Sequence, residues 1–594
     1  MIEKAAIQNF LLNRLNGIYR GAIMNSIKAI VAVEKKVWKT SPISAAITIL
    51  TGTIAGLIPA VLSSTTAEIV DFVSKGNASV SNVMPPMILL VGMYILNSIL
   101  QSAYSVANNA GVFEKVNLAL RADLCVKKAG VALIKFEMPA FLDRLEEADE
   151  IIENEEFPMA HYSFVNQVQA IVEIVSLALL LYRYHPYLCL LSCVSVLPIW
   201  INRWVRGNAF YGVKSKTAPA WRKAKKIQSW FVSEPHAKEL RINDSYNAML
   251  ERYNEKFDER VSVERGFYLN DYAKFAGCSL LKRVGLVASL VLSLKLAING
   301  KIEYGALAAA LLAFTSLQDS MTEFFKTIGQ IRYYVKRVLK LLDVYDEMEE
   351  DKKNNSITQG EKFELSDIRF TYPECDEETL KGITLKINKG ERIAIVGANG
   401  AGKTTLSKIL LGQFKPDKGQ VIYGIKEGER VAYVPQELPK LPITVREYLV
   451  MGNDMEPGDD EICSVLRELG LDSSLDFLSN MLGRAFGGRE LSGGQWQRLA
   501  IAKALLNKPA WYIFDEATRA IDPMQESAVF DSILAATTGK NAFIVTHRLA
   551  LCPHVEKVLL MENGKAVAFD THDNLMNESE DYAAMYRTQQ AGYV

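Results

Sequence analysis

The sequence predicts a multidomain chain in which an all-α domain of six membrane-spanning helices, with long helical extensions outside the bilayer, precedes an α/β domain. Two observations carry this prediction. Residues 41–67 and 76–113 contain no charged side chain, and a spanning helix needs about 20 apolar residues because hydrocarbon cannot solvate charge. Residues beyond 362 instead alternate short apolar strands with helical patterns. The net charge of −1 gives no indication of a nucleic-acid partner.

Six apolar stretches are predicted to cross the membrane. An even number of spans puts both ends of the chain on one side, and the basic residues that follow the fourth and sixth spans place that side in the cytoplasm. A multi-pass protein of the inner (plasma) membrane, with its α/β domain in the cytoplasm, is therefore expected. The predicted spans are approximately 43–63, 86–106, 161–182, 186–204, 280–298 and 304–325.

The two cytoplasmic connections, 114–159 and 205–277, are long and charged, and they show helical periodicity. The second to fifth spans are therefore expected to continue as helices for nearly 40 Å beyond the bilayer, at a rise of about 1.5 Å per residue. The turns at 139–144 and 231–241 would then press on the soluble domain. Two ordinary soluble insertions are the alternative.

Shifts in composition predict the domain boundaries. Residues 1–40 are expected to form an N-terminal amphipathic or elbow region, and 41–346 the transmembrane domain. A charged linker over 347–361 would then lead into the α/β domain at 362–594.

Three carboxylates are predicted at membrane depth: Glu173 in the third span, and Asp319 and Glu323 in the sixth. An ionised group there is costly and usually faces a cavity or a partner. These side chains either line a pathway that tolerates cationic cargo or form structural pairs, and the sequence leaves both alternatives open.

The α/β domain carries a glycine-rich loop directly after a β-branched apolar strand, 393–396. Residues 397–404 read Gly-Ala-Asn-Gly-Ala-Gly-Lys-Thr and lead into a helical stretch, which is the setting required of a phosphate-binding loop. Backbone N–H groups and the helix N-terminus would hold a polyphosphate. Lys403 would reach its terminal phosphates, and the Thr404 hydroxyl would ligate Mg²⁺.

Two carboxylates end a later apolar strand, 511–514. Asp515 suits the Mg²⁺ shell, and Glu516 is placed to polarise an attacking water as a general base. Between this strand and the phosphate loop, residues 491–495 read Leu-Ser-Gly-Gly-Gln and begin a second helix that can hold an anion. One chain thus has two phosphate-binding helix starts for one nucleotide, which favours two chains arranged head to tail.

These motifs, in this order, resemble the ATP-binding cassette (ABC) family, and together with the membrane half the whole chain is similar to a half-size ABC exporter of the type I fold. The resemblance implies that Tyr372 stacks on adenine, that Gln436 links Mg²⁺ to the membrane domain, and that His547 contacts the γ-phosphate. It also implies that 519–522 crosses the dimer, although Arg519 stands where the family more often has a small residue.

Motifs and resemblance together predict Glu516, His547 and Gln436 as the catalytic residues. The expected cofactors are ATP and Mg²⁺, and the metal would be held by Thr404, Gln436 and Asp515. The residues expected to bind ATP are Tyr372, Gly397, Asn399, Gly400, Gly402, Lys403, Thr404, Thr405, Ser492, Gly493, Gly494, Gln495 and Asp522.

The expected activity is an ATPase coupled to transmembrane transport, by alternating access in a homodimer, because Glu516, Gly493 and Gly494 leave both half-sites intact. The run 491–498 and the segment 238–241 look similar to exporters of modified peptides such as lanthipeptides, here without a peptidase domain. A multidrug or lipid exporter is the alternative, and an ATP-gated channel and a soluble ABC ATPase come next. The lipid bilayer and the cargo are the other expected partners.

Overall fold

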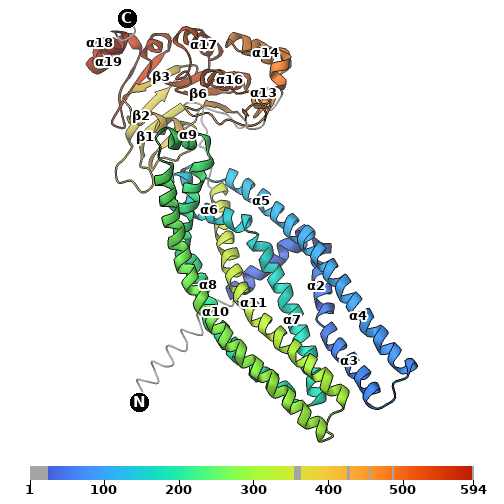
Figure 1. Ribbon diagram of the computed structural model, residues 1–594. Coiled ribbons are helices and arrows are strands. Elements are labelled where there is room, and N and C mark those ends of the chain that lie inside the picture. The colour runs from blue at the N-terminus through green and yellow to red at the C-terminus, as the bar shows by residue number, and fades with distance from the viewer. Residues whose placement is uncertain (1–23, 354–362, 424–428, 454–455, 485–486, 592–594) are drawn as a thin grey trace, which may run out of the picture. The chain divides into compact units, whose positions relative to one another are not determined.

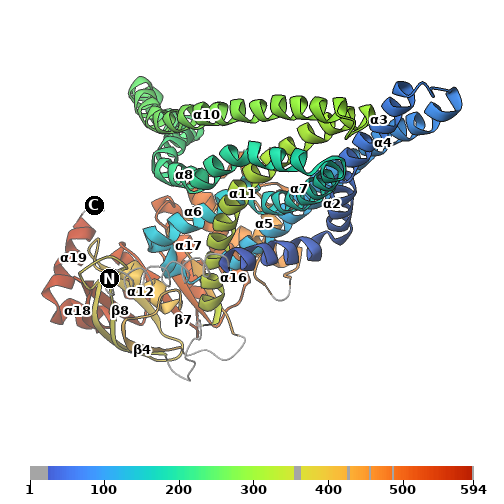
Figure 2. The ribbon, with the colours of Figure 1, turned by 90° about the horizontal axis from the view of Figure 1, so that it is seen from below.

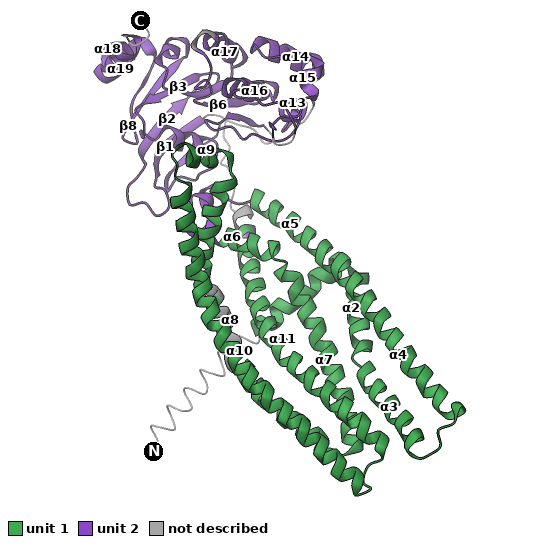
Figure 3. Ribbon diagram, viewed as in Figure 1, with its two compact units in different colours: residues 1–129, 144–348 green, residues 130–143, 349–594 purple. Residues whose placement is uncertain are grey.

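The computed structural model describes residues 24–353, 363–423, 429–453, 456–484 and 487–591 (Figure 1). Most of the N-terminal region predicted over 1–40 lies outside the described residues, and its last part, 24–40, is helical. The chain divides into two compact units (Figure 3). The first unit holds residues up to 129 together with 144–348, and the second holds 130–143 together with 349–594.

The first unit is helical throughout the part of it that the structure describes. Its helices are α2 (Pro42–Ala55), α3 (Ile58–Ser74), α4 (Val80–Val106), a π-helical turn η1 (Ala107–Phe113), α5 (Glu114–Ala129), α6 (Pro139–Glu153), α7 (Glu156–Tyr184), α8 (Pro186–Val232), α9 (Glu234–Ile242), α10 (Tyr246–Ile298) and α11 (Tyr304–Lys353).

Five of these helical segments in the described residues are long and apolar enough to cross a membrane: Pro42–Ser74, Val80–Ala129, Glu156–Tyr184, Pro186–Arg203 and Tyr246–Ile298. The first of them is broken between α2 and α3, near a proline that lacks the N–H a continuous helix needs. The predicted sixth span, 304–325, lies within α11, and its crossing of the membrane stays a prediction.

The connections 114–159 and 205–277, predicted to be cytoplasmic, are helical. They continue the second, fourth and fifth predicted spans without a break, whereas the third span lies in α7, which begins only at Glu156 and is separate from α6. α8 has 47 residues and α10 has 53, and the two pack along one another (Figures 1 and 2). The short helix α9 joins them, at the position predicted for the second turn. The first turn was predicted too late: the chain leaves α5 at Ala129 and forms a 3₁₀ turn, η2 (Leu133–Glu137), before α6 begins. α11 continues through Lys353, into the segment predicted as a linker.

A buried ionic cluster ties three of these helices together. Arg337 of α11 is 9% exposed, and its guanidinium donates to Glu156 at 2.6 Å, to Glu147 at 2.6 Å and to Glu150 at 3.4 Å. The Tyr333 hydroxyl donates to Glu156 at 2.7 Å. Because a buried charge is tolerated only when it is paired and hydrogen-bonded, this cluster fixes α11 against α6 and α7.

The second unit contains two sheets. One is antiparallel, with strand order β2 (Leu380–Ile387), β1 (Phe363–Phe370), β4 (Lys418–Ile422). The other has the order β5-β6-β7-β3-β8-β9, in which the strands from β5 to β8 are parallel. Its strands are β3 (Arg392–Gly397), β5 (Val431–Val434), β6 (Trp511–Asp515), β7 (Asn541–Val545), β8 (Lys557–Glu562) and β9 (Lys565–Asp570).

Helices cover the parallel sheet, since its strands are apolar on both faces. The central strands β3, β6 and β7 are almost fully buried. The helical elements of this unit are α12 (Lys403–Leu410), α13 (Val445–Val450), α14 (Asp459–Glu468), α15 (Leu475–Ser479), α16 (Gly493–Leu506), α17 (Pro523–Ala536), η4 (Leu549–His554), α18 (His572–Glu578) and α19 (Glu580–Ala591). The predicted fold class, a helical part followed by an α/β domain, is confirmed.

Candidate nucleotide site

The predicted catalytic and metal-binding residues lie at the carboxyl ends of four parallel strands. The phosphate loop follows β3, Gln436 follows β5, Asp515 and Glu516 end β6, and His547 follows β7. Parallel strands place their carboxyl ends at one edge of a sheet, which is where open α/β sheets bind ligands. Side chains separated by up to 150 positions are therefore brought to a common edge.

The phosphate loop is shaped by its backbone. Gly397 has φ +148°, and a Cβ there would lie 2.1 Å from the Met561 carbonyl oxygen, so that only glycine fits. The Lys403 ammonium donates to the carbonyls of Gly397 and Ala398, both at 2.9 Å, and burial lowers the pKa of this lysine. The lysine thus lies folded on its own loop, at the start of α12.

Asp515 fits a divalent cation. Both of its carboxylate oxygens are buried without a hydrogen-bond partner. Burial is the main cause that raises its pKa to about 6, with the neighbouring Glu516 adding to the effect. A buried, unpaired carboxylate is costly unless a cation joins it. Since Mg²⁺ prefers oxygen ligands, Asp515 and the hydroxyl of Thr404 are suited to hold it, where it would neutralise phosphate charge.

Glu516 is held in a strained backbone conformation, φ +50°. One carboxylate oxygen lies 2.7 Å from His547 Nε2, and the other accepts a hydrogen bond from Gln436 Nε2 at 2.9 Å. These three residues line a cavity of about 460 Å³. Its other lining residues are Asn399, Thr518, Arg519, Thr546 and Arg548. The structure therefore brings together the three residues predicted to be catalytic.

Arg519, which departs from the pattern of the resemblance, belongs to this cavity. Its Nη1 lies 3.7 Å from Glu516 Oε2, and its side chain is 68% exposed. Arg548 lies beside it but forms an ion pair with Glu526, so Arg519 is the more available cation. The sequence shows Arg519 only as a departure from the family pattern, whereas the structure places its guanidinium beside the Glu516 carboxylate.

We expect Arg519→Ser to raise basal ATP hydrolysis, by roughly twofold to threefold, because an exposed ion pair that restrains Glu516 is worth about 0.2–1 kcal/mol. The increase should shrink as ionic strength rises, since salt screens exposed pairs. Steady-state turnover in reconstituted protein at low and high salt measures both effects. Arg519→Lys is the control, and an equal loss of activity in both variants would contradict the expectation.

Hydrogen bonds between neighbouring residues stabilise the start of α16, the second helix predicted to bind an anion. The Ser492 hydroxyl accepts from Gln495 N at 3.2 Å, and the Gln495 side chain accepts from Ser492 N at 2.8 Å, which is a capping box. Gly494 approaches the 519–522 segment so closely that a Cβ would lie 2.8 Å from the Ala520 oxygen. None of the predicted residues of this helix start, Ser492 to Gln495, lines the cavity around Glu516, and nor does Asp522.

Tyr372 is not among the residues that line the cavity around Glu516. Its hydroxyl is 3.2 Å from that of Thr405, and its ring packs edge-on against Phe370 and Phe414. It is only partly buried and leaves an aromatic surface beside α12. The remaining predicted residues of the phosphate loop, Gly400, Gly402 and Thr404, lie between Tyr372 and the pair Asp515–Glu516 in the sequence.

The helical unit holds polar groups at the depth of the predicted spans. Lys282 of α10, which sequence inspection missed, is 6% exposed and donates to Asp319 of α11 at 2.5 Å. Its position next to Arg283, at the edge of an apolar stretch, was the available signal. Glu323 pairs with Lys326 on the same helix at 3.1 Å. Glu173 is half-buried and lies near Ser320 and Asp319.

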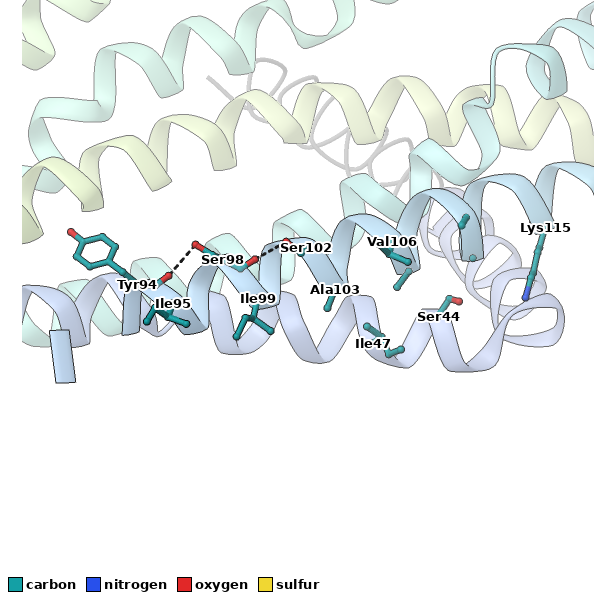
Figure 4. A pocket seen from close by; sticks show the side chains of 13 residues that line it. Ser44, Ile47, Tyr94, Ile95, Ser98, Ile99, Ser102, Ala103, Val106 and Lys115 are labelled. Atoms are coloured by element: carbon teal, nitrogen blue, oxygen red, sulfur yellow. Dashed lines mark hydrogen bonds between the residues drawn. The ribbon is translucent and has the colours of Figure 1, made fainter. Parts of the chain in front are cut away.

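A separate apolar groove of about 1070 Å³ lies between α2 and α4 (Figure 4). Ser98 and Ser102 of α4 each donate to the backbone carbonyl four residues earlier, so their hydroxyls are satisfied within the helix. The groove continues along η1, where Gly111 faces Ser44. None of the predicted site residues lines it.

Comparison with known proteins agrees with this geometry. Residues 380–519 match the model of the ABC transporter family. The chain is 25% identical to the subtilin transport ATP-binding protein SpaT of Bacillus subtilis over 89% of this chain and 90% of that protein. It is 25% identical to the nisin transport ATP-binding protein NisT of Lactococcus lactis over 62% of this chain and 66% of that protein. A glutathione/L-cysteine transport system ATP-binding/permease protein of Escherichia coli, CydC, is 32% identical over 48% of this chain and 52% of its own length.

The fold, the motifs and the family match therefore define the second unit as an ABC-type ATP-binding domain. The helices that precede it are apolar and long enough to cross a membrane, which is the organisation of a half-size exporter, and the chain is similar along most of its length to SpaT.

Proposed function

We propose that the chain is an ATP-driven exporter that works as a homodimer and moves a cationic peptide out of the cell. The observation that carries the proposal is the division of the nucleotide-binding groups into two separate half-sites. The phosphate loop and acidic pair share one sheet edge, whereas the helix start at Ser492 lies outside their cavity. A second copy, arranged head to tail, would bring its Ser492 to Gln495 onto the nucleotide held by the first.

In this proposal each residue has a defined task. Tyr372 stacks on the base, and Lys403 leaves its own loop carbonyls to bind the terminal phosphates, exchanging two hydrogen bonds for stronger charged ones. Glu516 takes a proton from the attacking water. His547 and Gln436, already bonded to Glu516, hold that carboxylate in line with the γ-phosphate.

Closing two cassettes around two nucleotides would drive the transport cycle. Changing a two-state equilibrium from 1:99 to 99:1 requires about 5.5 kcal/mol of differential binding, which two interfacial polyphosphates are suited to provide. The loops that follow α5 and α8 would pass this motion to the membrane helices. The cassette would lie on the cytoplasmic side of the inner (plasma) membrane, because the basic residues follow the fourth and sixth spans.

Two observations support a cationic peptide as cargo. The relatives SpaT and NisT are named for transport of subtilin and nisin. In addition, Lys282 is neutralised by Asp319, whereas Glu173 beside them lacks a cationic partner among the ion pairs of the described residues. The cluster therefore keeps one carboxylate available to a positive charge. A multidrug exporter is the alternative, supported by 30% identity over 43% of this chain to a probable multidrug resistance transporter, YheI.

The test measures stimulation of ATP hydrolysis in lipid nanodiscs by a cationic lanthipeptide, a neutral lipid and a cationic dye. We expect the peptide to stimulate most strongly. Glu173→Gln should raise the peptide concentration for half-maximal stimulation by roughly tenfold, since a hydrogen bond to a charged group contributes about 1.5–3 kcal/mol. Glu323→Gln is the matched control, because Glu323 already pairs with Lys326. Stimulation by the dye or the lipid alone would favour the alternative.

A further inference from the structure

The segment 130–143 belongs to the cassette unit, although it lies between two helices of the membrane part (Figure 3). Within it, the 3₁₀ turn η2 (Leu133–Glu137) packs Ile134 against the apolar core that contains residues of β1 and β3, and Tyr372 packs against the same core. A piece of the membrane half is thus part of the same compact unit as the nucleotide site, and it packs on the same apolar core as Tyr372.

An ion pair joins this turn to the helix that follows the phosphate loop. Glu137 Oε1 lies 3.0 Å from Lys408 Nζ, with the side chains 40% and 26% exposed. Lys408 stands in the last turn of α12, three positions beyond Thr405, whose hydroxyl contacts Tyr372. The pair therefore connects η2 with the loop that would hold the phosphates.

The same ammonium group lies over aromatic rings. Lys408 Nζ is 4.8 Å from the centre of the Phe414 ring and 5.8 Å from that of Tyr372, within the range of cation–π attraction. Phe414 in turn stacks on Phe370 at 5.4 Å and meets Tyr372 edge-on at 5.9 Å. Lys408 is long and flexible, and without a partner it would extend into water.

We propose that Glu137 is a positioning residue for nucleotide binding: it holds Lys408 over Tyr372 and Phe414, and so makes the affinity for ATP depend on the place of the 130–143 loop. The inference rests on the proposed ATP site, with Tyr372 as the base-stacking residue. Withdrawal of the loop carboxylate frees the ammonium, the ring loses its cationic contact, and the base is held less tightly. The loop thereby weakens or strengthens nucleotide binding without touching the reacting phosphate.

The experiment compares Glu137→Gln and Lys408→Met in the full chain reconstituted in lipid. Both variants should raise KM for ATP by about two- to fivefold, the equivalent of a cation–π contact of about 0.5–1 kcal/mol, and should leave kcat within twofold. The double variant should add little to either single one, because the two residues act through one contact. Glu364→Gln, which breaks the exposed pair with Lys386 in the same unit, is the matched control and should change nothing.

Two further variants distinguish positioning from a simple surface pair. Lys408→Arg keeps both the ion pair and the cation–π contact and should preserve KM. Glu137→Lys combined with Lys408→Glu restores the ion pair but puts a carboxylate over the rings, so it should not restore KM. Recovery of KM by the charge swap, an unchanged KM in both single variants, or a fall in kcat alone would overturn the inference.

Nucleotide affinity is also measured directly with a fluorescent ATP analogue. A wild-type chain that binds the analogue but is not stimulated by peptide would contradict the proposed cargo and leave the inference standing. If wild type and Glu137→Gln bound the analogue with the same affinity, this inference would be overturned and the proposed function would stand.

Discussion

Glu516→Gln is expected to lower kcat for ATP hydrolysis by about 10²–10⁴-fold while nucleotide still binds. The glutamine keeps the size of the side chain and its contacts with His547 and Gln436, but its amide cannot accept a proton from water. The retained nucleotide should hold two copies of the chain together. Single-turnover hydrolysis and size measurement with ATP check these two results.

Glu437→Gln is the matched control for this prediction, because it makes the same chemical change in an exposed residue next to Gln436. Its turnover should equal that of the wild type. Hydrolysis at the wild-type rate by Glu516→Gln would contradict the role of this carboxylate as general base, and with it the mechanism proposed for the cassette.

Arg337→Met is expected to destabilise the helical unit by about 3–5 kcal/mol, because it leaves Glu156, 6% exposed, without its cation. A unit of this size should then unfold about 10 °C lower, at roughly 2–4 °C for each kcal/mol. Thermal unfolding in detergent, followed by circular dichroism, measures the shift. ATP binding by the cassette unit at low temperature should persist.

Two variants sharpen this prediction. Lys225→Met breaks the exposed pair with Glu153, at 3.6 Å, and should shift the unfolding temperature little. Adding Glu156→Leu to Arg337→Met should recover part of the lost stability, since no unpaired carboxylate then faces the apolar interior at that point. If Arg337→Met unfolded at the same temperature as Lys225→Met, the cluster would not fix α11 against α6 and α7.

The sequence allowed the nucleotide half of the site to be predicted in detail because its signals are local. The strand–loop–helix pattern around Lys403 and the strand that ends in Asp515 and Glu516 each lie within about a dozen consecutive residues. The parallel order of β3, β6 and β7 then brings them to one edge. The apolar spans are local signals too, because burying a helix in lipid requires an unbroken apolar stretch.

Contacts between distant side chains could not be predicted in this way. Arg337 counted only as one of several basic residues after the sixth span, whereas the structure places it in a buried cluster with Glu156, 181 positions away. Lys282 stands beside Arg283 in the sequence, and only the structure shows that it is buried against Asp319.

The sequence by itself thus determined the class of each part and predicted the residues of the phosphate loop, since periodicity and turn chemistry depend on neighbouring residues. Only the tertiary structure decided which charges are paired, and that residues 130–143 belong to the cassette unit. The first turn was placed at 139–144, but the contact is made by Glu137, which meets Lys408 across 271 positions. Pairing over such separations depends on the packing of whole helices and sheets, and no local pattern encodes it.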